Sequence, residues 1–497
     1  MARAAIRSFL GPLLAALTMT ASPSMAQEPA PVTAPADWGQ ALAEDAQAFH
    51  DLVQANHPGP VDDENPAFNA RLERGLETAR ARARTADSYE DWYFALREYS
   101  ASFDDGHLSL SDWARMDHVW TANWPGFLTG LRGETHEVVF NRDPAAPPVG
   151  ARLVSCDDRP ADAFAAEYIG RTAGRWMLRS RRESYAGSLF VDQKNPYVRR
   201  PESCVFDVDG ATRTYALTWR PLPDAVRDEG FAQAASPRHL APVELRAWPR
   251  GFWISLGNFE SDPNTDDGRR LQALVEEIAA RADDIRPAPV VVFDLRGNNG
   301  GSSLWSSAIA RALWGEAWVE AVDSGTTSVD WRASPANLAT MEHYRDFVLT
   351  EGEAHDWAAK VAAGMAEALA HRSPLWVNAG DEDETPPAPP EGPSPMKARA
   401  YVLTDYGCAS ACLDAADVFL ALGAVQIGQE TSADTVYMDM RSDPLPSGRA
   451  EANVPMKVYR GRARGNNQSL VPAHAWTGAL DDTAGIEAWL VEIDAAR

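Results

Sequence analysis

The chain has 497 residues, of which 45% are hydrophobic and 24% are charged, as in ordinary globular proteins. At about 100–200 residues per domain, this length allows roughly three domains. The formal net charge of −25, from 71 acidic and 46 basic residues, argues against nucleic acid or an anionic membrane as a partner.

The first 26 residues have the pattern of a secretory signal peptide. Arg3 and Arg7 give it a basic start, residues 9–19 are apolar but too few to span a bilayer, and residues 24–26 form a small-x-small cleavage site. No later stretch reaches about 18 uninterrupted apolar residues, so we expect no membrane span in the mature protein. The sequence therefore predicts a periplasmic or secreted protein.

Two regions of different character follow the predicted signal peptide. Residues 27–115 are predicted to form a mostly helical domain, because apolar residues recur there at helical spacing. Residues 116–222 are predicted to be β-rich. Their short β-like runs, separated by turn residues, lie at residues 137–140, 150–155, 203–208 and 213–219.

Residues 240–497 alternate between strand-like and helix-like segments. This alternation predicts an α/β core with a largely parallel sheet and helices packed on it. We interpret residues 321–396 as an insertion into the core, with helical pieces at 339–349 and 355–369 and an acidic, proline-rich loop at 381–395. The insertion either covers an active site or has no role in function.

Ser410 is the first candidate for a catalytic residue. It follows the apolar run at residues 398–403 and a glycine-containing turn, and it precedes a helix rich in small residues. A serine at such a junction has an exposed hydroxyl and the N–H groups of a new helix beside it. These are the two requirements of an acyl-transfer nucleophile.

A second glycine-rich turn, at residues 297–301, follows the buried strand predicted for residues 289–295. Glycines at a strand end let the backbone turn sharply and direct its N–H groups outward. We expect Gly300 or Gly301 to give one oxyanion donor and the Ala411 N–H to give the other. A glycine-rich turn alone is equally suited to a phosphate.

His107 is the candidate base, because histidine is the usual partner of a catalytic serine. The four cysteines allow three disulfide connectivities, among them one in which Cys408 and Cys412 staple the turn around Ser410. No second CxxC or histidine cluster suggests a zinc site, and His50 and His57 lack the HExxH spacing of a metal peptidase.

Three motifs together resemble the peptidase family S41, which includes the C-terminal processing proteases and the tricorn core protease. They are Asp-Asp-Gly-His at residues 104–107, Phe-Asp-Leu-Arg-Gly-Asn-Asn-Gly-Gly at 293–301 and Gly-Cys-Ala-Ser-Ala-Cys at 407–412. The resemblance implies a ClpP/crotonase-like core behind an N-terminal helical segment and a PDZ-like β-rich domain. The PDZ-like part depends mainly on residues 138–139 and 150–160.

The S41 resemblance also bears on the base. Tail-specific members use a lysine after the serine, but Asp434 stands where that lysine would fall, and the next lysine is Lys457. The tricorn-like branch uses a histidine from an Asp-Gly-His-type motif, which His107 matches. The serine that precedes this histidine in the tricorn-like tetrad is replaced here by Gly106.

The acid that orients His107 is left open by the sequence. A glutamate after the serine completes the tricorn-like tetrad, and Glu430 and Glu451 are candidates, as is Asp105. His474 replaces an aspartate of the family near the C-terminus and is a second candidate for the base.

The sequence thus predicts an exported serine peptidase that hydrolyses peptides or unfolded proteins through an acyl-enzyme on Ser410, with His107 as general base. We expect no metal and no cofactor, and an oligomer is compatible with the sequence. Two alternatives remain: a non-catalytic, peptide-binding relative, because the family's base and acid are incompletely matched, and an esterase on the same scaffold.

Overall fold

The computed structural model describes residues 37–111, 120–235, 239–260, 262, 264–322, 326–349, 352–379, 388 and 390–496. The predicted signal peptide and most of the loop at 381–395 lie outside the described residues. The chain forms two compact units. Unit 1 contains residues 240–322 and 386–427, and unit 2 contains residues 23–239, 323–385 and 428–497.

Unit 1 is built on a sheet in which β10, β11, β12, β15 and β16 follow one another. β10 is antiparallel to β11, whereas β11, β12 and β15 are parallel. The strands are β10 (Val243–Trp248), β11 (Gly251–Leu256), β12 (Val290–Asp294), β15 (Arg399–Thr404) and β16 (Val425–Gly428). The largely parallel sheet predicted from the alternating pattern is confirmed.

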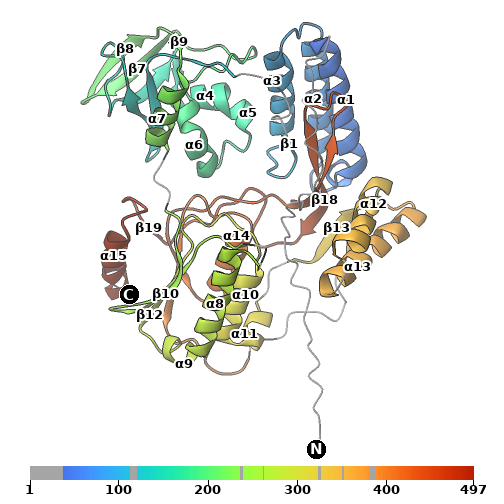
Figure 1. Ribbon diagram of the computed structural model, residues 1–497, viewed down its shortest axis with the longest axis vertical. Coiled ribbons are helices and arrows are strands. Elements are labelled where there is room, and N and C mark those ends of the chain that lie inside the picture. Colours follow the sequence, from blue (N-terminus) through green and yellow to red (C-terminus); the bar gives the residue numbers. More distant parts are fainter. Residues whose placement is uncertain are drawn as a thin grey trace, which may run out of the picture. The chain divides into compact units, whose positions relative to one another are not determined.

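Helices cover this sheet and bury its central strand. They are α8 (Asp266–Ala280), α9 (Ala282–Ile285), α10 (Leu304–Trp314), α11 (Glu316–Glu320) and α14 (Ala411–Ala421) (Figure 1). Every residue of β12 is buried, and the ring of Phe293 stacks on Phe419 of α14 at 4.2 Å between centroids. A continuous apolar run such as β12 is typical of a parallel strand that is covered on both faces.

The register of the parallel strands brings two turns to the same edge of the sheet. Asp294 at the end of β12 pairs with Leu403 near the end of β15. The turns at residues 295–301 and 405–410 therefore leave the sheet side by side. The carboxyl edge of a parallel sheet is where α/β proteins usually place their ligand sites.

Unit 2 begins with helices that pack together, as the apolar spacing predicted (Figure 1). They are α1 (Trp38–Asn56), the short η1 (Gly59–Val61), α2 (Phe68–Ala83) and α3 (Tyr89–Ala101). α3 starts with a capping box in which Ser88 and Asp91 each bond the other's backbone N–H. The apolar faces of these helices enclose a core that also includes Ala452 and Val454 of β18 (Glu451–Arg460).

The β-rich region predicted for residues 116–222 is also part of unit 2. β3, β4, β5, β7 and β8 follow one another in one sheet, with β6 on β5, and β2 pairs with β9. The strands are β2 (Asn123–Trp124), β3 (Phe127–Arg132), β4 (Thr135–Asn141), β5 (Arg152–Cys156), β6 (Arg159–Pro160), β7 (Ser203–Val208), β8 (Ala211–Ala216) and β9 (Arg220–Pro221). The helical segments are α4 (Ala161–Ala165), η3 (Ala166–Gly170), α5 (Arg171–Ala173), α6 (Arg179–Tyr185), η4 (Ala186–Ser188) and α7 (Asp224–Ala234).

The predicted insertion contributes to a further sheet of unit 2, in which β1, β18, β13 and β14 are neighbours and β17 pairs with β18. These strands are β1 (Ser109–Ser111), β13 (Ser328–Arg332), β14 (Leu375–Asn378) and β17 (Tyr437–Pro444). The helical segments are α12 (Pro335–His343), η5 (Tyr344–Val348), α13 (Gly352–Ala370) and the C-terminal α15 (Thr483–Ala495), and β19 is His474–Ala475. The helix predicted at 339–349 is thus shifted toward the N-terminus, because Pro335 starts it and Ser334 caps it. No described helix is long and apolar enough to cross a membrane.

Candidate active site

Ser410 lies between β15 and α14 and is the residue directly before the helix. Its backbone has φ 55° and ψ −129°, a combination that residues other than glycine rarely adopt. The residue is half-buried. A serine on a strained strand-to-helix turn is the arrangement by which many hydrolases present a nucleophile. The strand–turn–helix junction predicted from the sequence is therefore present.

The glycine-rich turn after β12 packs directly against Ser410. Gly300 has a φ of 110°, and a Cβ atom at this position would lie 2.7 Å from the Cβ of Ser410 and 2.8 Å from the carbonyl oxygen of Ala409. Any residue larger than glycine would both clash with the turn that carries Ser410 and adopt a disfavoured backbone conformation.

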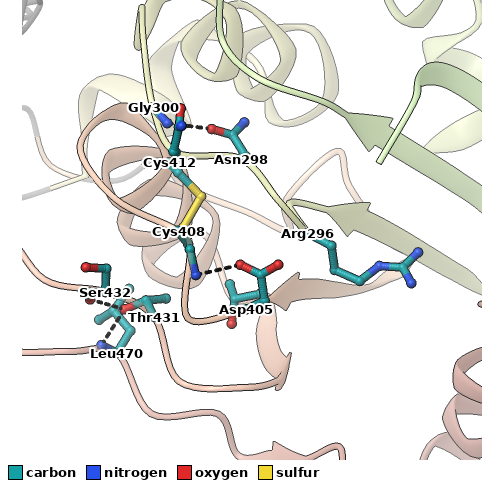
Figure 2. Close-up of a disulfide and its surroundings, with 12 residues drawn as sticks. Arg296, Asn298, Gly300, Asp405, Cys408, Cys412, Thr431, Ser432 and Leu470 are labelled. Carbon is teal, nitrogen blue, oxygen red and sulfur yellow. Dashed lines mark hydrogen bonds between the residues drawn. A yellow bond between two sulfur atoms is a disulfide. The ribbon is translucent and has the colours of Figure 1, made fainter. Parts of the chain in front are cut away.

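Asp405, which is labelled in Figure 2, joins the two turns. One carboxylate oxygen accepts a hydrogen bond from the Gly297 N–H at 2.7 Å, and the other accepts one from the Gly407 N–H at 2.8 Å. The side chain is buried. Charge-assisted bonds of this kind are stronger than neutral ones. Asp405 therefore fixes the position of the glycine-rich turn relative to the turn that carries Ser410.

The charged residues of the Asp-Leu-Arg motif have a structural role. Asp294 and Arg296 form a fully buried ion pair with 2.5 Å between Oδ2 and Nη2, and the Trp253 indole N–H donates to the same carboxylate at 3.0 Å. A buried charge pair needs such additional bonds to offset its loss of hydration. These contacts hold the start of the glycine-rich turn.

Three backbone N–H groups were predicted to bind an oxyanion, and their surroundings differ. The Gly300 N–H donates to the Asn298 side chain at 2.9 Å. Ala411 is the first residue of α14, so its N–H lies at the helix N-terminus. The Gly301 and Ala411 N–H groups donate to no other described residue. Gly301 and Ala411 are therefore better suited to bind a developing negative charge than Gly300.

Two disulfides connect the four cysteines. Cys408 is bonded to Cys412, on either side of Ser410 in the sequence, which is one of the pairings that the sequence allowed (Figure 2). Cys156 is bonded to Cys204, and the two lie opposite each other on β5 and β7. All four residues are buried.

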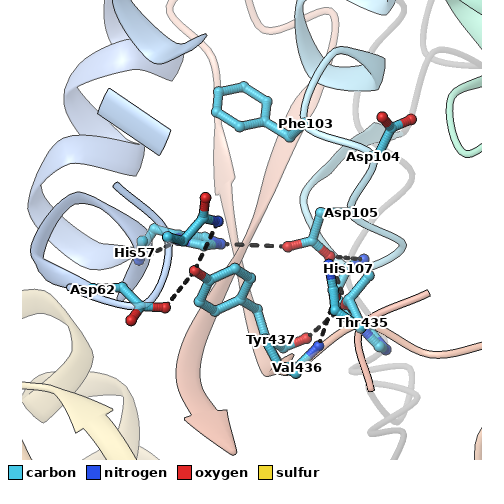
Figure 3. A network of polar contacts seen from close by, with 12 residues as sticks. His57, Asp62, Phe103, Asp104, Asp105, His107, Thr435, Val436 and Tyr437 are labelled. Atoms are coloured by element: carbon cyan, nitrogen blue, oxygen red, sulfur yellow. Dashed lines mark hydrogen bonds and ion pairs between the residues drawn. The ribbon is translucent and has the colours of Figure 1, made fainter. Parts of the chain in front are cut away.

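His107 lies in unit 2, at the end of the helical segment, with its ring directed at a hydroxyl (Figure 3). Its Nδ1 is 3.3 Å from the Oγ1 of Thr435, and that hydroxyl donates to Asp105 Oδ1 at 2.9 Å. Asp105 also accepts the His107 backbone N–H at 2.8 Å. Because the Thr435 hydroxyl donates its hydrogen to Asp105, its oxygen is free to accept a hydrogen bond from Nδ1–H, which leaves Nε2 as the basic atom of His107.

His57 supports Asp105 from the other side. The Gly59 N–H donates to His57 Nδ1 at 2.8 Å, so the neutral ring carries its proton on Nε2, which lies 3.5 Å from Asp105 Oδ2. The ring is fully buried, stacked on Phe68 and in edge contact with Tyr437. These contacts leave the imidazole little freedom to turn.

The pKa values of this buried pair shift together. Burial lowers the pKa of His57 below its ordinary value, although the nearby carboxylate of Asp105 opposes the shift. Burial acts to raise the pKa of Asp105, but the contacts with His57 and His107 outweigh it, and the pKa of Asp105 is lowered. Asp105 is therefore ionised at neutral pH and is able to stabilise a proton on a neighbouring imidazole.

The other acid candidates are not joined to the histidine. In the described part of the chain, no hydrogen bond or ion pair connects Glu430 or Glu451 with His107. Glu451 starts strand β18, where it is paired with Ser111. His474 is in the short strand β19. Of the three acids considered from the sequence, the structure connects Asp105 to His107.

Gly106 stands where the tricorn-like pattern has a serine, and the structure gives a reason for the glycine. A Cβ atom at Gly106 would lie 2.6 Å from a guanidinium nitrogen of Arg175. That arginine also bonds the Asn467 side chain and the Ala433 carbonyl. The hydroxyl beside His107 comes instead from Thr435, in a distant part of the sequence.

Three residues were not predicted from the sequence: Thr435 and His57 beside Asp105 and His107, and Asp405 in the turn before Ser410. A threonine has no motif of its own, and Thr435 is adjacent to His107 only because the chain folds back. His57 was considered only as a metal ligand. Asp405, in the turn just before Ser410, was the one with a usable signal, since an acid in a tight turn commonly bonds nearby backbone N–H groups.

No group of three or more described His, Cys, Asp or Glu residues is arranged to hold a metal ion. That the reaction needs no metal stays a prediction from the serine chemistry.

No protein-family model matches this chain, and no curated protein matches it in sequence. Solved structures are similar to it. Mature CPAF is 12% identical, with 92% of this chain and 97% of that chain covered and a TM-score of 0.57. Mature CPAF complexed with lactacystin is 10% identical, with coverages of 93% and 100% and a TM-score of 0.56. At this identity the likeness concerns the fold, and it confirms the predicted α/β fold class with a β-rich domain.

Two further solved structures have lower TM-scores. A putative S41 protease from Bacteroides fragilis is 13% identical, with 90% of this chain and 97% of that chain covered and a TM-score of 0.33. The tricorn protease is 11% identical, with coverages of 92% and 37% and a TM-score of 0.36.

Proposed function

We propose that this protein is an exported serine peptidase of the S41 kind, with Ser410 as nucleophile and His107 as general base. The observation that carries the proposal is the conformation of Ser410, held at the start of α14 with Gly300 packed against it. Backbone strain at a serine persists where the surrounding structure enforces it, and such positions cluster at active sites. The mature CPAF fold supports the same reading, since one of its structures holds lactacystin.

In this mechanism His107 Nε2 takes the proton of the Ser410 hydroxyl as the oxygen attacks the carbonyl carbon of a peptide bond. The carbonyl oxygen becomes an oxyanion, which the Gly301 and Ala411 N–H groups bind. Gly300 has no side chain and so permits the glycine-rich turn to pack closely against Ser410. The protonated His107 then gives its proton to the leaving amine. Water, deprotonated by the same nitrogen, releases the acyl group from Ser410.

We propose Asp105 as the acid of this site, acting on His107 through the Thr435 hydroxyl. Its support is the pair of contacts at 2.9 Å and 3.3 Å that link carboxylate, hydroxyl and imidazole. Glu430, the residue first expected from the S41 resemblance, has no such link. We expect Asp105→Asn to slow peptide hydrolysis as strongly as His107→Ala does, and Glu430→Gln to hydrolyse peptides at close to the wild-type rate.

Export is part of the proposal. The predicted signal peptide and the two disulfides support it, because disulfides persist in oxidising compartments such as the periplasm. The substrate class we propose is a peptide or an unfolded protein. A folded protein would have to unfold locally before one of its peptide bonds could reach Ser410.

The experiment is a digest of a diverse peptide library followed by mass spectrometry, with wild type and Ser410→Ala side by side. Cleavages found only with wild type are expected, and they also give the sequence specificity. Equal spectra for the two would contradict a peptidase. Ester hydrolysis by wild type alone would then favour the esterase, and peptide binding without turnover would favour a binding protein.

A further inference from the structure

The disulfide next to the nucleophile is unusual in its position. Cys408 and Cys412 enclose Ser410 at their midpoint, and both sulfur-bearing residues are buried while Ser410 is half-buried. Cys408 lies in the turn after β15, and Cys412 is in the first turn of α14. The bond therefore connects the end of the turn with the first turn of the helix, across the proposed nucleophile Ser410.

The backbone around Ser410 explains why such a bond matters. A φ of 55° is disfavoured for serine, so this residue tends to relax toward negative φ unless its surroundings prevent it. The Leu413 N–H bonds the Ser410 carbonyl at 2.8 Å, and the Cys412 N–H bonds the Ala409 carbonyl at 3.1 Å. These are ordinary bonds of a helix start, where fraying is common. The disulfide is the covalent restraint on the same five residues.

The two disulfides of the chain differ in a way that separates positioning from stability. Cys408 and Cys412 are 4 residues apart, whereas Cys156 and Cys204 are 48 apart. A disulfide that closes a longer loop restricts the unfolded chain more and contributes more to stability. The short Cys408–Cys412 ring is therefore expected to contribute less to global stability and to act mainly on local geometry.

We propose that the Cys408–Cys412 disulfide holds Ser410 in its reactive conformation, so that the protein gains its full nucleophile only when these two thiols are oxidised. This proposal rests on the assignment of Ser410 as nucleophile. In the reduced protein, as made in a reducing compartment, Ser410 is a weak nucleophile. Oxidation of the two thiols after export gives Ser410 its full reactivity.

The oxidation step is a thiol–disulfide exchange with a small disulfide such as oxidised glutathione. The thiolate of one cysteine attacks the glutathione disulfide and forms a mixed disulfide, releasing one glutathione thiol. The second cysteine then displaces the other glutathione, which forms the Sγ–Sγ bond between Cys408 and Cys412. The protein loses two electrons and two protons, and one glutathione disulfide becomes two thiols. Because both cysteines are buried in the folded protein, exchange takes place while the turn is still open during folding.

The test compares the double variants Cys408→Ala/Cys412→Ala and Cys156→Ala/Cys204→Ala with wild type. The readouts are the second-order rate of labelling by a fluorophosphonate probe, which reports the serine independently of peptide specificity, and the thermal midpoint of unfolding. We expect Cys408→Ala/Cys412→Ala to label about tenfold to a hundredfold more slowly, since a misplacement of about 1 Å costs rates of this order. Cys156→Ala/Cys204→Ala is expected to lose more thermal stability and to keep the wild-type labelling rate.

A second experiment tests the proposal even if the Cys408→Ala/Cys412→Ala variant fails to fold. The Cys156→Ala/Cys204→Ala protein contains a single cysteine pair, so its oxidation state is unambiguous by alkylation and intact mass. It is refolded with and without oxidised glutathione, and the fluorophosphonate labelling rate of the folded fraction is measured. If this variant does not fold, wild type is refolded in the same way and its Cys408–Cys412 peptide is mapped.

A labelling rate that rises with the fraction of oxidised Cys408–Cys412 is expected. Equal rates for the dithiol and disulfide forms, or wild-type labelling by Cys408→Ala/Cys412→Ala, would overturn the proposal. Failure of the underlying assignment looks different: oxidised wild type and Ser410→Ala would then label alike.

Discussion

Replacing Thr435 by valine tests the link between His107 and Asp105. Valine has nearly the shape of threonine but no hydroxyl, and Thr435 is only 2% exposed, so packing is preserved while one polar atom is removed. The variant deletes the contact with His107 Nδ1 at 3.3 Å and the bond to Asp105 at 2.9 Å. Asp105 keeps the His107 backbone N–H and the neighbouring His57, so the fold around it is retained.

The size of the effect follows from the kind of bond that is lost. A hydrogen bond to a charged group contributes about 1.5–3 kcal/mol. In the proposed mechanism His107 carries a proton in the transition state, and the Thr435–Asp105 link would stabilise that proton. At about 1.4 kcal/mol for each factor of ten, losing the link reduces kcat by about 10- to 150-fold. Thr435 acts through His107, so we expect KM to change little.

The assay is steady-state hydrolysis of a fluorogenic peptide chosen from the library digest, with the thermal midpoint measured in parallel. Thr435→Ser is the matched control, because it keeps the hydroxyl and removes only a methyl group. It should recover most of the wild-type kcat. A wild-type kcat in Thr435→Val, or a Thr435→Ser enzyme as slow as Thr435→Val, would show that the hydroxyl has no role in orienting His107.

Two further predictions concern the framework of the site. Gly300→Ala places a Cβ atom 2.7 Å from that of Ser410 at a φ of 110°, so we expect loss of fluorophosphonate labelling and a destabilisation of about 1–3 kcal/mol; normal labelling would exclude the close approach. The pKa of the buried His57 ring is lowered from its ordinary value of 6.5, so below pH 6.5 the unfolded chain binds a proton at His57 that the folded protein does not bind. The free energy of unfolding therefore decreases as the pH is lowered, by up to about 1.4 kcal/mol per pH unit, until the pKa of the folded state is reached. Chemical denaturation from pH 7 to pH 5 should therefore show a flatter slope in His57→Gln than in wild type, and equal slopes would contradict a neutral, buried His57.

Much of unit 1 could be predicted because its signals are local. The buried strand at residues 290–294, the glycine-rich turn and the serine before a helix all follow from short sequence patterns. The staple between Cys408 and Cys412 was one of the pairings expected, since both lie within one turn of the same segment. The parallel order of the strands followed from the alternation of strand and helix.

The surroundings of His107 could not be predicted in the same way, because they depend on long-range folding. Thr435 is more than three hundred residues from His107 in the sequence, yet the two are in contact. His57 becomes part of the network through burial between Phe68 and Tyr437, which no spacing rule indicates. The S41 pattern favours a glutamate after the serine, whereas the carboxylate that contacts the surroundings of His107 in the structure is Asp105, two residues before the histidine.

The roles of Ser410 and His107 are tested by mapping the adduct that a fluorophosphonate probe forms with the oxidised protein and by measuring its rate of formation in wild type, His107→Gln and His474→Gln. We expect one adduct, on Ser410, that forms at the wild-type rate in His474→Gln and at least about a hundredfold more slowly in His107→Gln, because the latter loses the general base. An adduct on another residue, or undiminished labelling in His107→Gln, would contradict these roles.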